Sequence, residues 1–388
     1  MLFILLNTFQ IFSQHEKISD EASISILTCS SGDELYSLFG HTAIRVNDPV
    51  NDFDYVFNYG TFDFNTPNFY LKFMRGELNY MLSVSTYNRF LNQYKYDERD
   101  VYEQKLSLTD AEVETLFLAL IENSKTENRY YKYHFFFDNC ATRVRDIIAD
   151  NIYQGVVFKE ADYFKDMTFR DAIETYLKYR SWTKLGLDLI LGAPTDDVVD
   201  KETVQFLPDF LMMQFDNAVN KKNSEKIVSK TTTVIEFDRE EKSLSVTPDI
   251  ALWLAALLIS FITFYEFKQK RLFKAINILI FATTTVVGLL IVFLWFFTSH
   301  TVTGPNWHIL WANPAHILII VQTFKNKTMS KTTGYFLFFL SLPIIFMPVL
   351  VLILNQYIPL VLIAVWYIMV IRIALIFYNA GVIFPAKN

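Results

Sequence analysis

The sequence predicts an α+β domain outside the membrane, followed by an all-α transmembrane bundle of about five helices. Residues 15–247 are mixed and charged, whereas long apolar runs separated by short polar turns begin at Asp249. The first part contains both strand-like and helix-like segments. The net charge of −6, with no basic stripe in the first part, argues against nucleic acid as a partner.

The N-terminal segment Met1–Gln14 predicts an export signal. Its apolar residues form a short hydrophobic region, and Ser13 stands near a plausible cleavage point. No basic residue precedes this region, so a short buried strand or helix is the alternative. The chain therefore divides into a signal-like segment over residues 1–14, a periplasmic domain over 15–247 and a transmembrane domain over 248–388.

A hairpin is predicted early in the periplasmic domain. Asn47–Asp52 reads NDPVND, which is turn chemistry between two strands. His41 opens the strand before this turn, and Asn58 lies on the strand after it. The strands predicted in this region are Ile24–Thr28, His41–Val46 and Asp54–Tyr59.

Two helices follow the predicted strands. Thr109–Glu112 reads TDAE, a capping box that begins a helix running to about Ser124. The second helix begins near Cys140, directly after the aromatic run Tyr130–Phe137 and a polar Asp-Asn pair. Apolar residues recur there at helical spacing, at Ala141, Val144, Ile147 and Ile148.

The second part of the chain contains five apolar runs. A membrane span needs about 20 apolar residues, so the first and third runs are near the minimum. Four spans result if Asn313–Pro314 is re-entrant. The runs cover residues 250–265, 272–298, 307–324, 334–354 and 357–380.

Basic residues between the runs predict the orientation. Cytoplasmic loops are enriched in Lys and Arg, and the loops Ser299–Asn306 and Asn355–Tyr357 contain neither. The basic loops should therefore be cytoplasmic, which places the first domain in the periplasm, as the export signal also requires. These basic residues are Lys268, Lys270, Arg271 and Lys274, followed by Lys325, Lys327 and Lys331.

Cys140 is the candidate nucleophile. Backbone N–H groups and the helix dipole at a first helical turn stabilise a thiolate, so the pKa of the thiol is expected to fall. The other cysteine of the chain is Cys29, and a disulfide between the two is the alternative in an oxidising compartment. The two cysteines show no metal-ligand spacing, and no metal or dissociable cofactor is expected.

His41 is the candidate base for this thiol. It follows a glycine at a strand start, where a side chain can face a cleft. His15 falls near the chain start, and His134 falls in the aromatic run, where packing or a hydrogen bond is the simpler role. Asn58 is the candidate that orients the imidazole, with Asp63 as the alternative.

Candidates for substrate binding come from both parts of the chain. Arg143 is placed to stabilise a thiolate or a phosphate head group, with a solvated helix face as the alternative. The loop Ser299–Ile317 is rich in Trp and polar residues that suit a membrane interface; its candidates are His300, Asn306 and His308. His316 and Arg372 lie within apolar runs, where a polar side chain is costly and suggests a function.

Several of these segments together resemble a known family. A histidine on a strand followed by a cysteine on a helix resembles the permuted papain-like fold of NlpC/P60 relatives. More specifically, TCSSGDELYSLFGHTAIRV, VFNYGTFDFNTPNFYLKFMRGEL and FFFDNCATRVRD, with the later LWANP, resemble the Lnb family of lipoprotein N-acyltransferases. The resemblance implies that Cys140 is the nucleophile and His41 the base. It leaves the third member, and a pairing of Cys29 with Cys140, open.

The function predicted on these grounds is lipoprotein N-acylation at the bacterial inner membrane. An acyl chain from a phospholipid or a diacylglyceryl group would pass through a Cys140 thioester to the α-amine of a lipoprotein's N-terminal cysteine. The partners are thus membrane phospholipid and lipidated lipoprotein N-termini. The alternatives are a membrane-tethered Cys-His peptidoglycan or peptide amidase and a non-catalytic envelope assembly protein.

Overall fold

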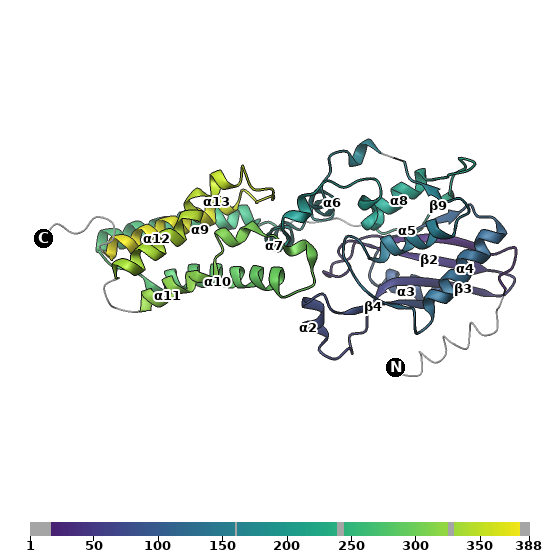
Figure 1. Ribbon diagram of the computed structural model, residues 1–388, viewed down its shortest axis with the longest axis horizontal. Helices are drawn as coiled ribbons and strands as arrows, with labels where there is room; N and C mark the ends of the chain where they lie inside the picture. The colour runs from purple at the N-terminus through teal and green to yellow at the C-terminus, as the bar shows by residue number, and fades with distance from the viewer. Residues whose placement is uncertain (1–16, 160, 239–243, 325–329, 381–388) are drawn as a thin grey trace. The chain divides into compact units, whose positions relative to one another are not determined.

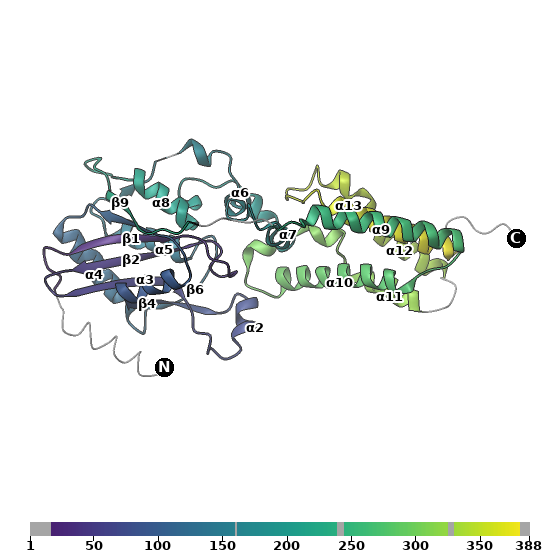
Figure 2. The same ribbon diagram turned by 180° about the vertical axis from the view of Figure 1, so that it is seen from behind.

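The structure is a computed structural model, and it describes residues 17–159, 161–238, 244–324 and 330–380 (Figures 1 and 2). The chain forms two compact units. The first unit comprises residues up to Tyr176 together with the stretch from Val198 to about residue 240, and the second comprises Leu177–Asp197 and the C-terminal part. The predicted signal segment 1–14 lies outside the described residues.

The first unit is built on a seven-stranded antiparallel sheet with the strand order β6-β4-β3-β2-β1-β5-β9. The predicted hairpin is present, because β2 and β3 pair with Ile44 opposite Phe57. On the other side of β2, Cys29 of β1 lies opposite His41. The strands are β1 (Ser23–Cys29), β2 (His41–Asp48), β3 (Phe53–Thr61), β4 (Asn79–Thr86), β5 (Val101–Leu106), β6 (Tyr130–Lys132) and β9 (Val228–Ile235).

Helices cover both faces of this sheet. Successive side chains of a strand point to opposite faces, so Ile44 and Phe57 pack with Val144 of α5 in one apolar core. Ala43 and Val56 instead contribute to a second core on the opposite face, with α3. The helices on the first face are α4 (Asp110–Ser124), α5 (Cys140–Asn151) and α8 (Pro208–Asn217), and the helix on the second face is α3 (Tyr87–Tyr96).

Both helices predicted for the periplasmic domain are confirmed. The side chain of Thr109 accepts a hydrogen bond from the backbone N–H of Glu112, and the Glu112 carboxylate accepts one from the backbone N–H of Thr109, which is the predicted capping box at the start of α4. Shorter elements complete the unit: α2 (Phe69–Met74), β7 (Val156–Val157), η1 (Asp162–Phe164), α6 (Phe169–Glu174), η3 (Thr203–Phe206) and β8 (Val219–Asn220).

The second unit is helical. In the described part of the chain, four helices are long and apolar enough to cross a membrane. They are α9 (Pro248–Gln269), α10 (Lys274–Phe296), α12 (Lys331–Leu350) and α13 (Leu362–Asn379). The remaining elements are α7 (Ser181–Ile190), η2 (Ala193–Asp196), η4 (Thr301–Thr303), η5 (Trp307–Leu310), η6 (Pro314–His316) and α11 (Ile317–Phe324).

The apolar run 307–324 does not form a spanning helix. It is divided into η5, η6 and the eight-residue α11. The Asn313 side chain accepts a hydrogen bond from the backbone N–H of Ala315, and Pro314 has no N–H to continue a helical ladder. In the described residues the run 307–324 is thus interrupted at Asn313–Pro314, and four other helices have the length of a span.

Residues Leu177–Asp197 lie within the range 15–247 predicted as the periplasmic domain, yet they pack with the second unit. Helix α7 contacts α9 and α10, and its Leu185 and Leu189 join the apolar core of the second unit. The backbone N–H of Gly192 donates to the Val302 carbonyl at 2.8 Å. The apolar side of α7 explains this assignment, because Leu185 and Leu189 pack, partly buried, against the core of the second unit.

Candidate active site

Cys140 is the first residue of α5, as the sequence predicts. The side-chain oxygen of Asn139 accepts hydrogen bonds from the backbone N–H groups of Ala141 (2.8 Å) and Thr142 (2.9 Å). The Asn139 amide Nδ2 in turn donates to the carbonyls of Phe135 and Phe206, at 2.7 Å each. Asn139 is buried, so this cap fixes the start of the helix and with it the thiol.

Two features of its surroundings shift the pKa of the Cys140 thiol in opposite directions. Burial raises the pKa, whereas hydrogen bonds from the backbone N–H groups of Thr42, Ala141 and Cys140 and from the Tyr133 hydroxyl lower it. Burial dominates, and the pKa of the thiol is raised above its ordinary value. The prediction of a lowered pKa is therefore wrong: the helix start is present, but the thiol is removed from water.

His41 opens β2, and the backbone before it is unusual. Gly40 has φ +75°, and a Cβ at this position would lie 2.8 Å from the Cys29 carbonyl oxygen. Burial, followed by the positive charge of Arg99, lowers the pKa of His41 to about 4, while the hydrogen bond with Asn58 acts in the opposite direction. The imidazole is consequently neutral at neutral pH and able to accept a proton.

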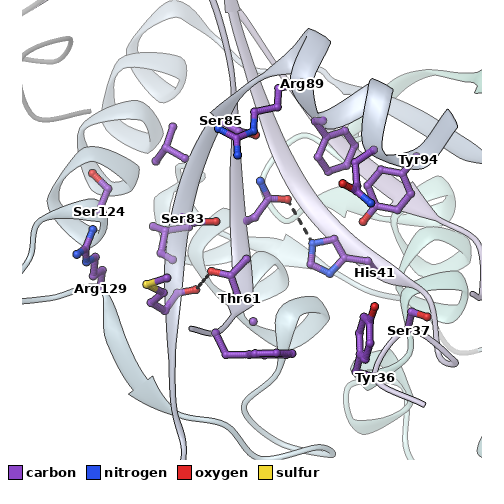
Figure 3. A pocket seen from close by; sticks show the side chains of 18 of the residues that line it. Tyr36, Ser37, His41, Thr61, Ser83, Ser85, Arg89, Tyr94, Ser124 and Arg129 are labelled. Carbon is purple, nitrogen blue, oxygen red and sulfur yellow. Dashed lines mark hydrogen bonds between the residues drawn. The ribbon is translucent and has the colours of Figure 1, made fainter. Parts of the chain in front are cut away.

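Asn58 orients this imidazole. Its Oδ1 lies 3.4 Å from Nε2 of His41, and its Nδ2 donates to the Val56 carbonyl. Since Oδ1 can only accept, Nε2 of His41 carries the hydrogen and Nδ1 has the free lone pair. Figure 3 shows His41 with this bond as a dashed line. Asp63, the other candidate for this role, instead accepts hydrogen bonds from Asn65 within its own turn.

The backbone segments that carry the three residues lie close together at one end of the hairpin. The Thr42 N–H that bonds to the Cys140 sulfur belongs to the peptide directly after His41. A Cβ on Gly60, two residues beyond Asn58, would lie 3.4 Å from the Cβ of Cys140. Among the hydrogen bonds of the described residues none joins the thiol to the imidazole. Both groups nevertheless project from neighbouring backbone positions, as a nucleophile and its base require.

A cavity of about 790 Å³ lies beside His41 and Asn58 (Figure 3). Its aromatic lining includes Tyr36, Phe62 and Phe64, and the rings of Tyr36 and Phe62 meet edge to face at 6.2 Å. Its basic lining residues are Arg89, Arg99, Lys125 and Arg129. No aspartate or glutamate lines it within the described ranges, so the cavity combines apolar walls with positive charge.

Sequence reasoning missed Tyr133, Gly60 and Arg99. The Tyr133 hydroxyl donates to the Cys140 sulfur, and its ring stacks on Tyr80 at 4.3 Å. Tyr133 stands in the aromatic run before Cys140, which is a weak signal shared by five other Tyr and Phe residues. Arg99 follows a helix and precedes a strand, and no motif marks it.

The remaining predicted residues are held by other contacts. The Arg143 guanidinium forms an ion pair with Asp138 (2.5 Å) and lies 3.6 Å from the centre of the Tyr131 ring. It is therefore positioned by the first turn of α5 and does not line the cavity beside His41. His134 accepts hydrogen bonds at Nδ1 from the backbone N–H groups of Phe136 and Phe137.

His300, Asn306 and His308 belong to the second unit. Asn306 and His308 are fully buried. The amide of Asn306 donates to the Leu189 carbonyl at 2.9 Å, and Nδ1 of His308 accepts a hydrogen bond from the Trp311 ring N–H at 2.9 Å. These bonds hold the loop after α10 together. His300 lies at its start, with its backbone N–H donating to Thr298.

Both cysteines are free thiols and both are buried. Cys29 lies opposite His41 on β1, and burial raises its pKa to about 12. The alternative of a disulfide between Cys29 and Cys140 is therefore not what the structure contains. Within the described residues, no group of three or more His, Cys, Asp or Glu side chains is arranged to hold a metal ion.

Comparison with known families matches both parts of the chain. Residues 10–174 match the family model of the Lnb N-terminal periplasmic domain. Residues 239–380 match the family model of the Lnb transmembrane domain. No curated protein and no solved structure matches the chain. The two matches occur in the order of the two predicted domains, and the second covers the apolar helices of the second unit.

Proposed function

The chain belongs to the Lnb family and is a membrane protein with an N-terminal periplasmic domain, and from this premise we propose that it is a lipoprotein N-acyltransferase of the bacterial inner membrane. The proposed reaction moves an acyl chain from a membrane glycerolipid to the α-amine of a lipoprotein's N-terminal cysteine. The observation that supports the proposal is the position of the Cys140 thiol at the start of α5, next to the peptide that follows His41, together with the His41–Asn58 hydrogen bond.

In the first step the Cys140 sulfur attacks an acyl ester carbonyl. Nδ1 of His41 takes the thiol proton as the S–C bond forms, and the imidazolium then gives it to the departing glycerol oxygen as the ester C–O bond breaks. The products are a thioester on Cys140 and a lipid with one free hydroxyl. Because the thiol and the imidazole are both neutral at rest, the proton moves during attack and not before it.

In the second step the α-amine of the acceptor attacks the thioester. His41 accepts a proton from the amine as the C–N bond forms, and the Cys140 sulfur departs and regains a proton. The product is an N-acylated lipoprotein and a free thiol, so the enzyme returns to its starting state. No external energy source is required, because the thioester conserves the activation of the acyl group.

The tetrahedral intermediate of both steps needs hydrogen-bond donors for its oxyanion. The N–H of Cys140 at the start of α5 is one donor. The Tyr133 hydroxyl, which already donates to the sulfur, is the second donor in this proposal.

The test is the intact mass of the purified full chain after incubation with phospholipid and then with a diacylated lipopeptide. We expect one added acyl group on the wild-type protein, cleaved by neutral hydroxylamine and discharged by the lipopeptide. Cys140→Ser should show no adduct. Cys29→Ser is the matched control, because Cys29 is also a buried free thiol, and it should still form the adduct.

A folded protein that forms no adduct and leaves the lipopeptide diacylated would contradict acyl transfer. If that protein instead cleaves a peptidoglycan peptide in a Cys140-dependent reaction, the tethered amidase is correct. The two free cysteines do not support the third alternative, a non-catalytic protein whose cysteines are bridged.

A further inference from the structure

Arg99 is a buried cation beside the candidate base. It is 6% exposed, and its positive charge lowers the pKa of His41. Its Nε donates to the Ser30 carbonyl at 2.7 Å, and its guanidinium carbon lies 4.8 Å from the centre of the Tyr94 ring. In the described structure no carboxylate pairs with it, and its Nη2 has no hydrogen-bond partner.

Such a residue is costly unless it binds an anion. A buried charge is normally paired, because removal from water without a partner costs several kcal/mol. The fork of an Arg guanidinium also matches the oxygens of phosphate and carboxylate groups. Nε is held by Ser30 and the guanidinium lies over the Tyr94 ring, whereas the buried Nη2 has no partner in the described structure, and Arg99 lines the cavity.

The cavity that Arg99 lines suits a lipid that carries this anion. Arg89, Lys125 and Arg129 add positive charge to the lining, which includes no acidic residue in the described part of the chain. Tyr36 and the Phe62 and Phe64 rings form an apolar part of the same lining; the two Phe rings lie 5.0 Å apart. Cationic and apolar walls in one cavity match a phosphate beside an acyl chain.

We propose that this cavity binds the phosphate-bearing head group of a glycerophospholipid, with Arg99 as the ligand of the phosphate and His41 next to the ester. The inference rests on the proposed function and selects its acyl donor. A phospholipid carries a phosphodiester next to its esters, whereas the diacylglyceryl group of a lipoprotein carries none. Phosphate recognition therefore distinguishes the donor from the acceptor, which share the same glycerol and acyl chains.

The test measures binding of lipids that cannot react. The full chain in detergent is titrated with an ether-linked dialkyl phosphatidylglycerol and with the matching dialkylglycerol, and bound lipid is counted by native mass spectrometry. We expect the phospholipid to bind at least about tenfold more tightly than the dialkylglycerol, as a charge-assisted hydrogen bond predicts. Arg99→Gln should remove this difference by weakening phospholipid binding alone.

Two variants keep the result interpretable. Arg99→Lys retains the charge and should keep part of the preference, even if the Ser30 contact changes. Arg75→Gln is the matched control, because Arg75 is exposed, pairs with Glu77 and does not line the cavity, so its affinities should equal those of the wild type. An equal preference in Arg99→Gln and wild type, with both proteins folded, would overturn the proposal.

Competition with inorganic phosphate shows whether the site recognises a lipid head group or free phosphate. If phosphate alone displaces the ether phospholipid at concentrations close to those of the lipid itself, the site recognises free phosphate and the lipid assignment is wrong. Weak displacement supports the lipid head group. Because the ether lipids cannot be cleaved, an Arg99-dependent preference stands even if no acyl-enzyme forms, and the acyl-enzyme can form even if the preference is absent.

Discussion

At the scale of residues, burial sets the protonation states of the candidate pair. It raises the pKa of the Cys140 thiol and lowers the pKa of His41 to about 4. Many thiol enzymes depend on a preformed thiolate beside an imidazolium. Here both groups are neutral, so in the proposed reaction His41 would take the thiol proton during attack, and the oxyanion donors would supply more of the stabilisation.

The first prediction concerns pH. A base must be neutral to act, so activity is present above the pKa of His41 and is lost as pH falls through it. We expect kcat/KM for a soluble acyl p-nitrophenyl ester to fall with a midpoint near the His41 pKa of about 4, and not near the ordinary value of 6.5. Arg99→Gln removes a positive charge and should move this midpoint to higher pH; an unmoved midpoint would contradict the assignment.

The second prediction concerns Tyr133. Replacing it with Phe removes the hydroxyl that donates to the sulfur and keeps the ring that stacks on Tyr80. Acylation should slow by about a hundredfold, the usual effect of deleting one oxyanion donor, with little change in melting temperature. Single-turnover acylation measures it. Tyr80→Phe, which keeps the stacking and has no contact with the sulfur among those described, serves as the control.

Part of this site could be predicted from residues alone. Strand alternation and the turn at 47–52 predicted that His41 and Asn58 lie on neighbouring strands, and the polar pair before Cys140 predicted a helix start. Tyr133, Gly60 and Arg99 reach the thiol or the imidazole through tertiary packing. Their separation from Cys140 and His41 along the chain carries no periodic signal, which is why sequence reasoning did not find them.

At the scale of elements, the cap of α5 fixes the position of the nucleophile. We predict that Asn139→Ala lowers the free energy of unfolding by about 2 kcal/mol, through the lost cap and the two carbonyls left without a donor. Acylation should fall as well, since Cys140 is the first residue after the cap. Thermal unfolding in detergent and the intact-mass assay measure the two effects.

Thr109→Ala is the matched control for that prediction. Thr109 caps α4 with the same kind of capping box, but its contacts are exposed and remote from the thiol in the chain. Thr109→Ala should lower the free energy of unfolding by about 1 kcal/mol and leave acylation unchanged. Equal losses of acylation in the two variants would mean that α5 is not positioned by its cap.

Element prediction succeeded where the local pattern was strong. The capping box at Thr109 and the apolar stripe after Cys140 each predicted a helix, and the structure confirms both helices. The run 307–324 is apolar enough for a span but carries Asn313 and Pro314, whose local chemistry ends helices. The sequence predicts α7 as part of the periplasmic domain, but the structure groups it with the second unit. The hydropathy of a ten-residue element does not reveal which unit it packs against.

At the scale of the whole molecule, a buried ion pair joins the helices of the second unit. Arg372 of α13 pairs with Glu266 of α9, and its Nε donates to Asn277 of α10 at 2.8 Å. All three side chains are fully buried. The polar residue that the sequence placed in the last span therefore connects three helices.

We predict that breaking this pair is worse than replacing it. Glu266→Gln leaves a buried guanidinium without its counter-charge and should destabilise the protein by about 3–5 kcal/mol. Glu266→Gln combined with Arg372→Met should recover much of that loss. Thermal unfolding in detergent compares them, with the exposed pair variant Glu77→Gln as a control that changes little. A double variant less stable than the single one would contradict the prediction.

The placement of Leu177–Asp197 has a consequence for the order of synthesis. The chain leaves the first unit after Tyr176, returns after Asp197 and leaves again near residue 240. Helix α8 and the edge strand β9 are therefore translated after a segment that belongs to the other unit. The sheet cannot be completed as the ribosome releases its first 176 residues, and a fragment cut at residue 247 would retain α7 without the helices that bury Leu185 and Leu189. No single cut in the chain therefore separates the two units, because the first unit contains residues on both sides of Leu177–Asp197.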